Sequence, residues 1–202
     1  MSAGAQGPAQ IMNRRSFFVS ASALAAWVLL SGHSPYRKFH IFRKTRLIVM
    51  APNDDKRAGV VADAVVAFFS IHWSDSRPSS GRAQTAPEVV KLLVSNQLDV
   101  AVLSQKDAAA ARAGQGRFAK QGPSPLCALA VFKVHVLVTR EDLLKPIAEK
   151  ITQPLLANWS TVDRDLSGAV ESPYVGQEIG IPLHSVAADL YQRMPAAKEP
   201  AG

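Results

Sequence analysis

The sequence contains little cysteine and little charge, and it lacks a long apolar run. Its 202 residues include one cysteine, Cys127, which excludes an intramolecular disulfide framework. Only 19% of the residues are charged and 48% are hydrophobic, a balance that excludes a disordered chain. No apolar run reaches the roughly 20 residues that span a bilayer, which excludes a polytopic membrane protein. The length allows one sizeable domain with a real core, or two small ones.

Common motifs of catalysis and cofactor binding are also missing. The five histidines do not follow metal-ligand spacing, and there is no Gly-x-Ser-x-Gly elbow. The apolar run over residues 47–51 is followed by Pro-Asn-Asp-Asp instead of a glycine-rich phosphate loop. We therefore predict that the protein is not an enzyme and uses neither a metal nor a cofactor. Cys127 lies in an apolar run and is interpreted as a small core residue.

The positive charge is concentrated at the N-terminus. The formal net charge is +7, and residues 1–46 hold seven basic residues and no acidic one. Residues 47–202 carry 16 basic and 16 acidic residues, so the remainder of the chain is neutral. A neutral domain lacks the basic surface that nucleic-acid binding requires. We predict no nucleic-acid partner.

Residues 1–34 have the pattern of an export signal. Arg14 and Arg15 precede a short apolar stretch over residues 19–30. The paired arginines followed by two phenylalanines resemble the signal of the twin-arginine export route, which implies a periplasmic or other extracytoplasmic location. The pattern fits both a cleaved signal and an N-terminal membrane anchor.

A basic linker follows over residues 35–45, where Arg37, Lys38, Arg43 and Lys44 gather. Residues 17–46 are thus a candidate for membrane association, because basic side chains are attracted to anionic lipid. The alternative is a solvated tether. The chain has two candidate starts, Met1 and Met12, because residues 1–11 have the composition of a low-complexity extension.

From residue 46 onward the pattern alternates between strands and helices. We predict strands over 47–51, weakly over 71–77, over 98–103 and over 126–139; helices over 59–72, 85–96 and 108–113; and loops over 78–82 and 114–125. This alternation predicts an α/β fold with a mostly parallel sheet and helices on both faces.

Beyond Asp142 the pattern weakens. We expect a helix over 147–158 around Pro154, an irregular stretch over 160–181, and a last amphipathic helix over 186–194. The predicted organisation is an α/β lobe over residues 46–142 and a C-terminal helical segment over 143–202 that packs on it.

Three predicted loops are candidates for a binding site, because open parallel sheets bind ligands beyond the carboxyl ends of their strands. Their small polar groups and backbone amides suit a small polar or carboxylate solute. Arg82 or Lys106 would neutralise a carboxylate. The alternative is that these residues only close turns and cap helices. The candidate ligand-binding residues are Asn53, Asp54, Ser80, Gly81, Arg82, Ser104 and Gln105.

Residues 88–104, a helix that leads into the strand Leu-Asp-Val-Ala-Val-Leu, resemble a hallmark of type 2 periplasmic solute-binding proteins. The pair Ser80-Gly81 and the late Ile-Pro-Leu-His-Ser-Val-Ala over 181–187, followed by Tyr191, resemble the TAXI branch, which is associated with TRAP transporters. The resemblance covers about residues 46–140 and 179–194. It implies an exported protein that delivers a small organic acid or other polar solute to a membrane permease.

The chain departs from that family in two places. Pro52-Asn53-Asp54-Asp55 stands where the branch has a glycine-rich loop with a tyrosine. After Arg140 no second alternation of strand and helix is visible, whereas the family traps solute between two lobes. The alternative hypothesis is therefore a one-lobe homologue that acts as an interaction or scaffold protein at the membrane.

Overall fold

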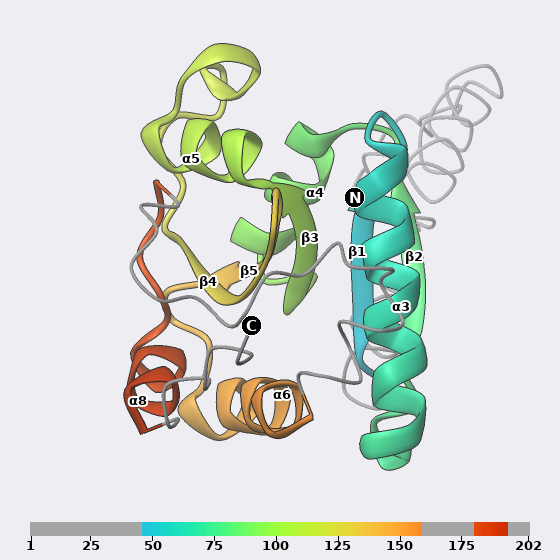
Figure 1. Cartoon of the computed structure of the whole chain (residues 1–202). Helices are drawn as coiled ribbons and strands as arrows, with labels where there is room; N and C mark the ends of the chain where they lie inside the picture. The colour runs from blue at the N-terminus through green and yellow to red at the C-terminus, as the bar shows by residue number, and fades with distance from the viewer. Residues whose placement is uncertain (1–45, 159–179, 194–202) are drawn as a thin grey trace, which may run out of the picture. The chain divides into compact units, whose positions relative to one another are not determined.

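The computed structural model describes residues 46–158 and 180–193, which form a five-stranded sheet with helices (Figure 1). All of them belong to one of the two units into which the chain divides, residues Phe39–Gly202. The predicted signal at Arg14 and Arg15, the linker over 35–45 and nearly all of the predicted irregular stretch lie outside the described residues. In chain order the elements are β1 (Ile48–Pro52), α3 (Lys56–His72), the 3₁₀ turn η1 (Ser74–Ser76), β2 (Ser79–Ala83), α4 (Ala86–Val94), β3 (Val100–Ser104), α5 (Gln105–Ala113), the 3₁₀ turn η2 (Gly116–Phe118), β4 (Leu126–Phe132), β5 (His135–Arg140), α6 (Lys145–Ala157) and α8 (Ser185–Arg193).

The sheet has the strand order β2-β1-β3-β5-β4. β1 pairs in parallel with both β2 and β3, whereas β5 runs antiparallel to β3 and to β4. The predicted α/β class with a mostly parallel sheet is therefore confirmed. The helices expected over 59–72, 85–96 and 108–113 correspond to α3, α4 and α5, and those expected over 147–158 and 186–194 correspond to α6 and α8.

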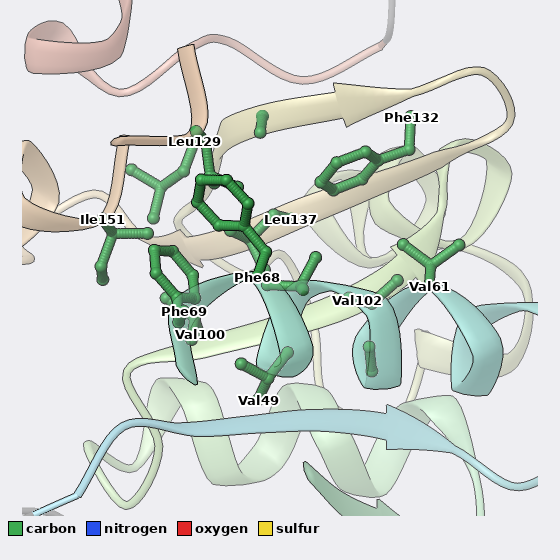
Figure 2. Close-up of a cluster of buried hydrophobic side chains, with 14 of the residues drawn as sticks. Val49, Val61, Phe68, Phe69, Val100, Val102, Leu129, Phe132, Leu137 and Ile151 are labelled. Atoms are coloured by element: carbon green, nitrogen blue, oxygen red, sulfur yellow. The ribbon is translucent and has the colours of Figure 1, made fainter. Parts of the chain in front are cut away.

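Two apolar clusters cover the two faces of the sheet. On one face, Phe68 and Phe69 of α3 pack against Leu137 of β5 and Ile151 of α6 (Figure 2). The cluster on the other face joins α4 and α5 to the same strands, with Met50 and Leu93 among its members. Helices thus cover both faces, as predicted. Cys127 is 2% exposed in β4, which confirms its interpretation as a core residue, and burial raises the pKa of its thiol to about 12.

The predicted strand over 71–77 and loop over 78–82 are both wrong. Residues 71–72 complete α3, residues 74–76 form η1, and Ser79–Ala83 form the edge strand β2. The sequence does not predict a strand at β2 because its residues, Ser-Ser-Gly-Arg-Ala, are polar or small and lack the apolar pattern of a strand. Pairing with the buried strand β1 overrides this weak strand propensity.

The single strand predicted over 126–139 is a hairpin of β4 and β5. The chain reverses at Lys133 and Val134, and Lys133 has a φ of 44°. A two-residue turn of this kind normally contains Asn-Gly or another glycine pair, and Lys133-Val134 has neither, so no turn was predicted here. The reversal places β5 antiparallel between β3 and β4.

The strand order reverses between β1 and β3. From β1 the chain passes through α3 to β2 on one side, and from β2 it passes through α4 to β3 on the other side. The segments that follow β1 and β3 therefore diverge, since α3 packs on one face and α5 on the other. In open α/β sheets such a switch point leaves a crevice beyond the carboxyl ends of the strands.

Candidate functional site

A network of charged side chains lies at this switch point. Arg117, from η2, places Nη1 2.5 Å from Oδ2 of Asp54, which follows β1. Its Nε and Nη2 lie 3.1 and 2.6 Å from the two carboxylate oxygens of Asp107 on α5. Arg117 thus joins the segments after β1 and β3 by three hydrogen bonds, and its side chain is still 40% exposed. Partial burial lowers the pKa of Arg117, but the hydrogen bonds that it donates to Asp107 and Asp54, together with their negative charges, outweigh this effect and raise the pKa.

Ser104 completes the network on the β3 side. Its hydroxyl donates to Oδ2 of Asp107 over 2.9 Å and accepts the backbone amide of Asp107 over 3.1 Å. Ser104 is therefore both the last residue of β3 and the N-cap residue of α5. The adjacent Gln105 donates through Nε2 to the Lys133 carbonyl over 2.7 Å and holds the hairpin tip beside the network.

A second contact, between Asp55 and His135, lies next to the arginine network. Asp55 caps α3 by accepting the amides of Arg57 and Ala58, and its other oxygen lies 3.0 Å from Nε2 of His135 at the start of β5. Partial burial opposes ionisation of Asp55, but the Ala58 amide and His135 outweigh it and hold the pKa of Asp55 below its ordinary value. The pair joins the β1 loop to the hairpin.

The structure brings together four of the seven predicted ligand-binding residues at this edge. Asn53 and Asp54 follow β1, and its neighbour β3 ends at Ser104 and is followed directly by Gln105. Ser80 and Gly81 lie instead within β2, opposite Val49 and Met50 of β1. A Cβ on Gly81 would lie 2.9 Å from the Met50 sulfur, so glycine at this position serves packing against β1.

Arg82 points toward α3 instead of the switch point. Its Nη2 donates to Oδ2 of Asp63 over 2.7 Å and to the Gly59 carbonyl over 3.0 Å. It borders a hollow of about 230 Å³ beside the first two turns of α3. The hollow is lined by Pro52, Asn53, Asp55, Lys56, Gly59, Val60, Asp63 and Arg82. Lys106, the other predicted cation, lies exposed in the first turn of α5.

Sequence reasoning missed Arg117, Asp107 and His135 as members of this edge. Arg117 is 63 positions from Asp54, and His135 is 80 positions from Asp55, so no local pattern connects them. The available signal was a lone arginine in a glycine-rich segment, between Gly114 and Gly122, after the helix that follows β3.

Among the described residues, this edge contains neither a hydrogen-bonded nucleophile–base pair nor a cluster of metal ligands. The Ser104 hydroxyl donates to Asp107 and makes no hydrogen bond to His135 within the described residues, so the nucleophile–base contact needed for acyl transfer is not formed there. Over residues 46–158 and 180–193, no three His, Cys, Asp or Glu side chains gather as metal ligands.

None of the helices in those ranges is long and apolar enough to cross a bilayer.

No protein-family model matches this chain, and no curated protein matches it at a significant level.

Proposed function

We propose that this chain is an exported binding protein that holds a small carboxylate-bearing solute at the switch point between β1 and β3. The observation that carries the proposal is the arginine network of Asp54, Arg117 and Asp107. Asp107 holds the guanidinium along its Nε and Nη2 edge, so Nη1 faces the crevice of an open α/β sheet, where it can donate a charge-assisted hydrogen bond to a carboxylate. Export by a twin-arginine signal and delivery to a TRAP-type permease are parts of the proposal that rest on the sequence resemblance.

The two carboxylates that hold Arg117 have different roles in this proposal. Asp107 binds Nε and Nη2 and is itself fixed by Ser104, so it keeps the guanidinium in place. Asp54 makes one bond, to Nη1, from the exposed loop after β1. A solute carboxylate would replace Asp54 on Nη1 without breaking the bonds to Asp107. Asp54 is then an internal competitor for the ligand site.

The alternative is a one-lobe interaction or scaffold protein at the membrane. One observation favours it: within the described residues Asp54 and Asp107 already more than balance the charge of Arg117, and Asp55 is paired with His135. A network that only joins the loops after β1 and β3 has the same contacts. The two functions differ in whether a solute displaces Asp54.

The test is calorimetric titration of the purified full-length chain with succinate, glutamate, lactate and benzoate. We expect at least one of these to bind, and Arg117→Lys to weaken its binding by about tenfold or more, because a lysine ammonium cannot keep the two parallel bonds to Asp107 and also donate to the solute from a fixed position. Asp54→Asn removes the competing charge and is expected to tighten binding several-fold. No binding by any member of this panel would support the interaction protein.

Arg82→Lys is the matched control, since Arg82 is also paired with one aspartate on the surface. We expect it to leave the affinity unchanged. If Arg82→Lys abolishes binding and Arg117→Lys does not, the solute lies in the hollow beside α3, and the assignment to the switch point is wrong.

Export is tested separately with Arg14→Lys combined with Arg15→Lys. We expect the full chain to accumulate in the cytoplasm, measured by immunoblot of cell fractions, because the twin-arginine route requires both arginines. The control is Arg37→Lys combined with Arg43→Lys in the basic linker, which is expected to be exported normally. Unchanged export of the Arg14 and Arg15 variant would contradict the signal.

A further inference from the structure

Helix α3 carries apolar side chains on its outer surface as well as on the face that packs into the core of Figure 2. Val60 near its start is 64% exposed, and Ile71 near its end is 74% exposed. Between them lie Ala67, which is exposed, and Ala64, which is half-buried and also packs against the edge of the core cluster. We call Val60, Ala64, Ala67 and Ile71 the outer stripe. A surface helix of a monomer normally presents charged residues at such positions.

The spacing of the outer stripe is symmetric. Its members are separated by four, three and four residues, which places them along one side of the helix, as in the apolar seam of a coiled coil. In an antiparallel pair, Val60 would face the partner's Ile71, and Ala64 would face the partner's Ala67. The small residues at the centre would let the two backbones approach closely, and the larger ones would pack at both ends.

The charges at the two ends of α3 are complementary. Lys56 and Arg57 begin the helix, and Asp75 lies in η1 just after its end. None of the three takes part in an ion pair within the described residues. An antiparallel pair would place the basic start of each helix beside the partner's Asp75, whereas a parallel pair would place like charges together. Arg77 follows η1 and leads the chain into β2.

We propose that the outer stripe of α3 is the interface of a two-fold symmetric dimer of this chain, in which the two α3 helices pack antiparallel. The stripe is the same on both copies, as an isologous interface requires. Specific, stable interfaces bury at least about 1,200 Å² of surface. A single pair of helices of this length buries less, so we expect a weak dimer. Val60 also lines the hollow beside α3, so the partner's Ile71 would border it. The dimer does not depend on solute binding.

The first experiment is sedimentation equilibrium of the full chain over a range of concentrations. We expect a monomer–dimer equilibrium, and Ile71→Lys is expected to raise the dissociation constant at least tenfold. The control is Leu144→Lys, because Leu144, the N-cap residue of α6, is 66% exposed and is not a member of the stripe. Circular dichroism checks that both variants are folded. A monomer at all concentrations, or equal dissociation constants for the wild type and Ile71→Lys, would overturn the proposal.

A charge exchange tests the antiparallel arrangement without changing the stripe. Lys56→Glu combined with Arg57→Glu is expected to weaken the dimer, and so is Asp75→Lys alone. Combining all three changes restores opposite charges at each end, so the combined variant is expected to recover most of the wild-type association. Additive weakening in the combined variant would overturn the antiparallel arrangement.

Discussion

Two arginines near the sheet, Arg140 and Arg117, differ in their partners. Arg140, at the end of β5, is 7% exposed; its Nη1 donates to the carbonyls of Leu93 and Leu98, and its Nε donates to the exposed carboxylate of Asp142. Arg117 is 40% exposed, and its hydrogen bonds within the described residues go to carboxylates. Removing Arg140 would take a hydrogen-bond donor from two buried carbonyls, of which Leu93 keeps the Asn96 amide, whereas the partners of Arg117 can be hydrated by water. The difference separates a structural arginine from one available to a ligand.

The largest expected effect on stability is that of Arg140→Ala. We expect the free energy of unfolding to fall by about 2–4 kcal/mol, because two buried carbonyls lose a hydrogen-bond donor and the buried side chain is lost. Urea unfolding followed by circular dichroism measures this change. If Arg140→Ala lowered the free energy of unfolding by less than Arg117→Ala does, the distinction between a structural Arg140 and an exposed Arg117 would be wrong.

An intermediate effect is expected at Asp55, which contacts both backbone amides and His135. Its pKa is lowered in the folded state, so its stabilising contribution is complete well above its ordinary pKa of 3.8 and is lost as the pH falls through the lower, folded value. Asp55→Asn keeps a side chain that can cap the helix but removes the charge. We expect it to be about 1 kcal/mol less stable than the wild type at neutral pH and equally stable in strong acid.

Urea unfolding over a series of pH values measures this difference. Asp63→Asn is the control, because Asp63 makes a more exposed ion pair with Arg82 and is expected to show a smaller difference. A difference between the wild type and Asp55→Asn that is constant over the whole pH range would show that the charge of Asp55 does not contribute.

The smallest effect on stability is expected for Arg117→Ala. An ion pair this exposed contributes less than about 1 kcal/mol, so unfolding should change little while carboxylate binding is lost. The measurement combines urea unfolding with the calorimetric titration of the same sample. A loss of stability as large as that of Arg140→Ala would mean that the arginine network is structural.

The sequence predicts the central elements of the fold well because their apolar residues form either short continuous runs or a helical period. β1 and β3 are continuous apolar runs that end at polar turns, and α4 begins at the cap residue Thr85 with a proline in its first turn. These signals are local and do not depend on tertiary contacts. Prediction failed at β2 and at the β4–β5 turn, where pairing with neighbouring strands determines the conformation of residues with little local preference.

The candidate site could be predicted only in part, for the same reason. Asn53, Asp54, Ser104 and Gln105 follow directly from the ends of parallel strands, since these meet at one edge. Arg117 reaches that edge only because η2 folds back over the start of α5, a tertiary arrangement with no period in the sequence. The expected role of Arg82 rested on a loop that is in fact a strand, so its side chain meets Asp63 of α3 instead.

The most direct test of the central claim is a ¹H–¹⁵N spectrum of the arginine side chains during titration with the carboxylate that binds best in calorimetry. If a solute carboxylate replaces Asp54, the Nη–H signals of Arg117 will shift with added ligand, and those of Arg82 and Arg140 will stay in place. The Asp54→Asn variant is expected to reach the same end point at a lower ligand concentration. An Arg117 signal that does not move while the ligand binds would contradict the assignment of the solute site to the switch point between β1 and β3.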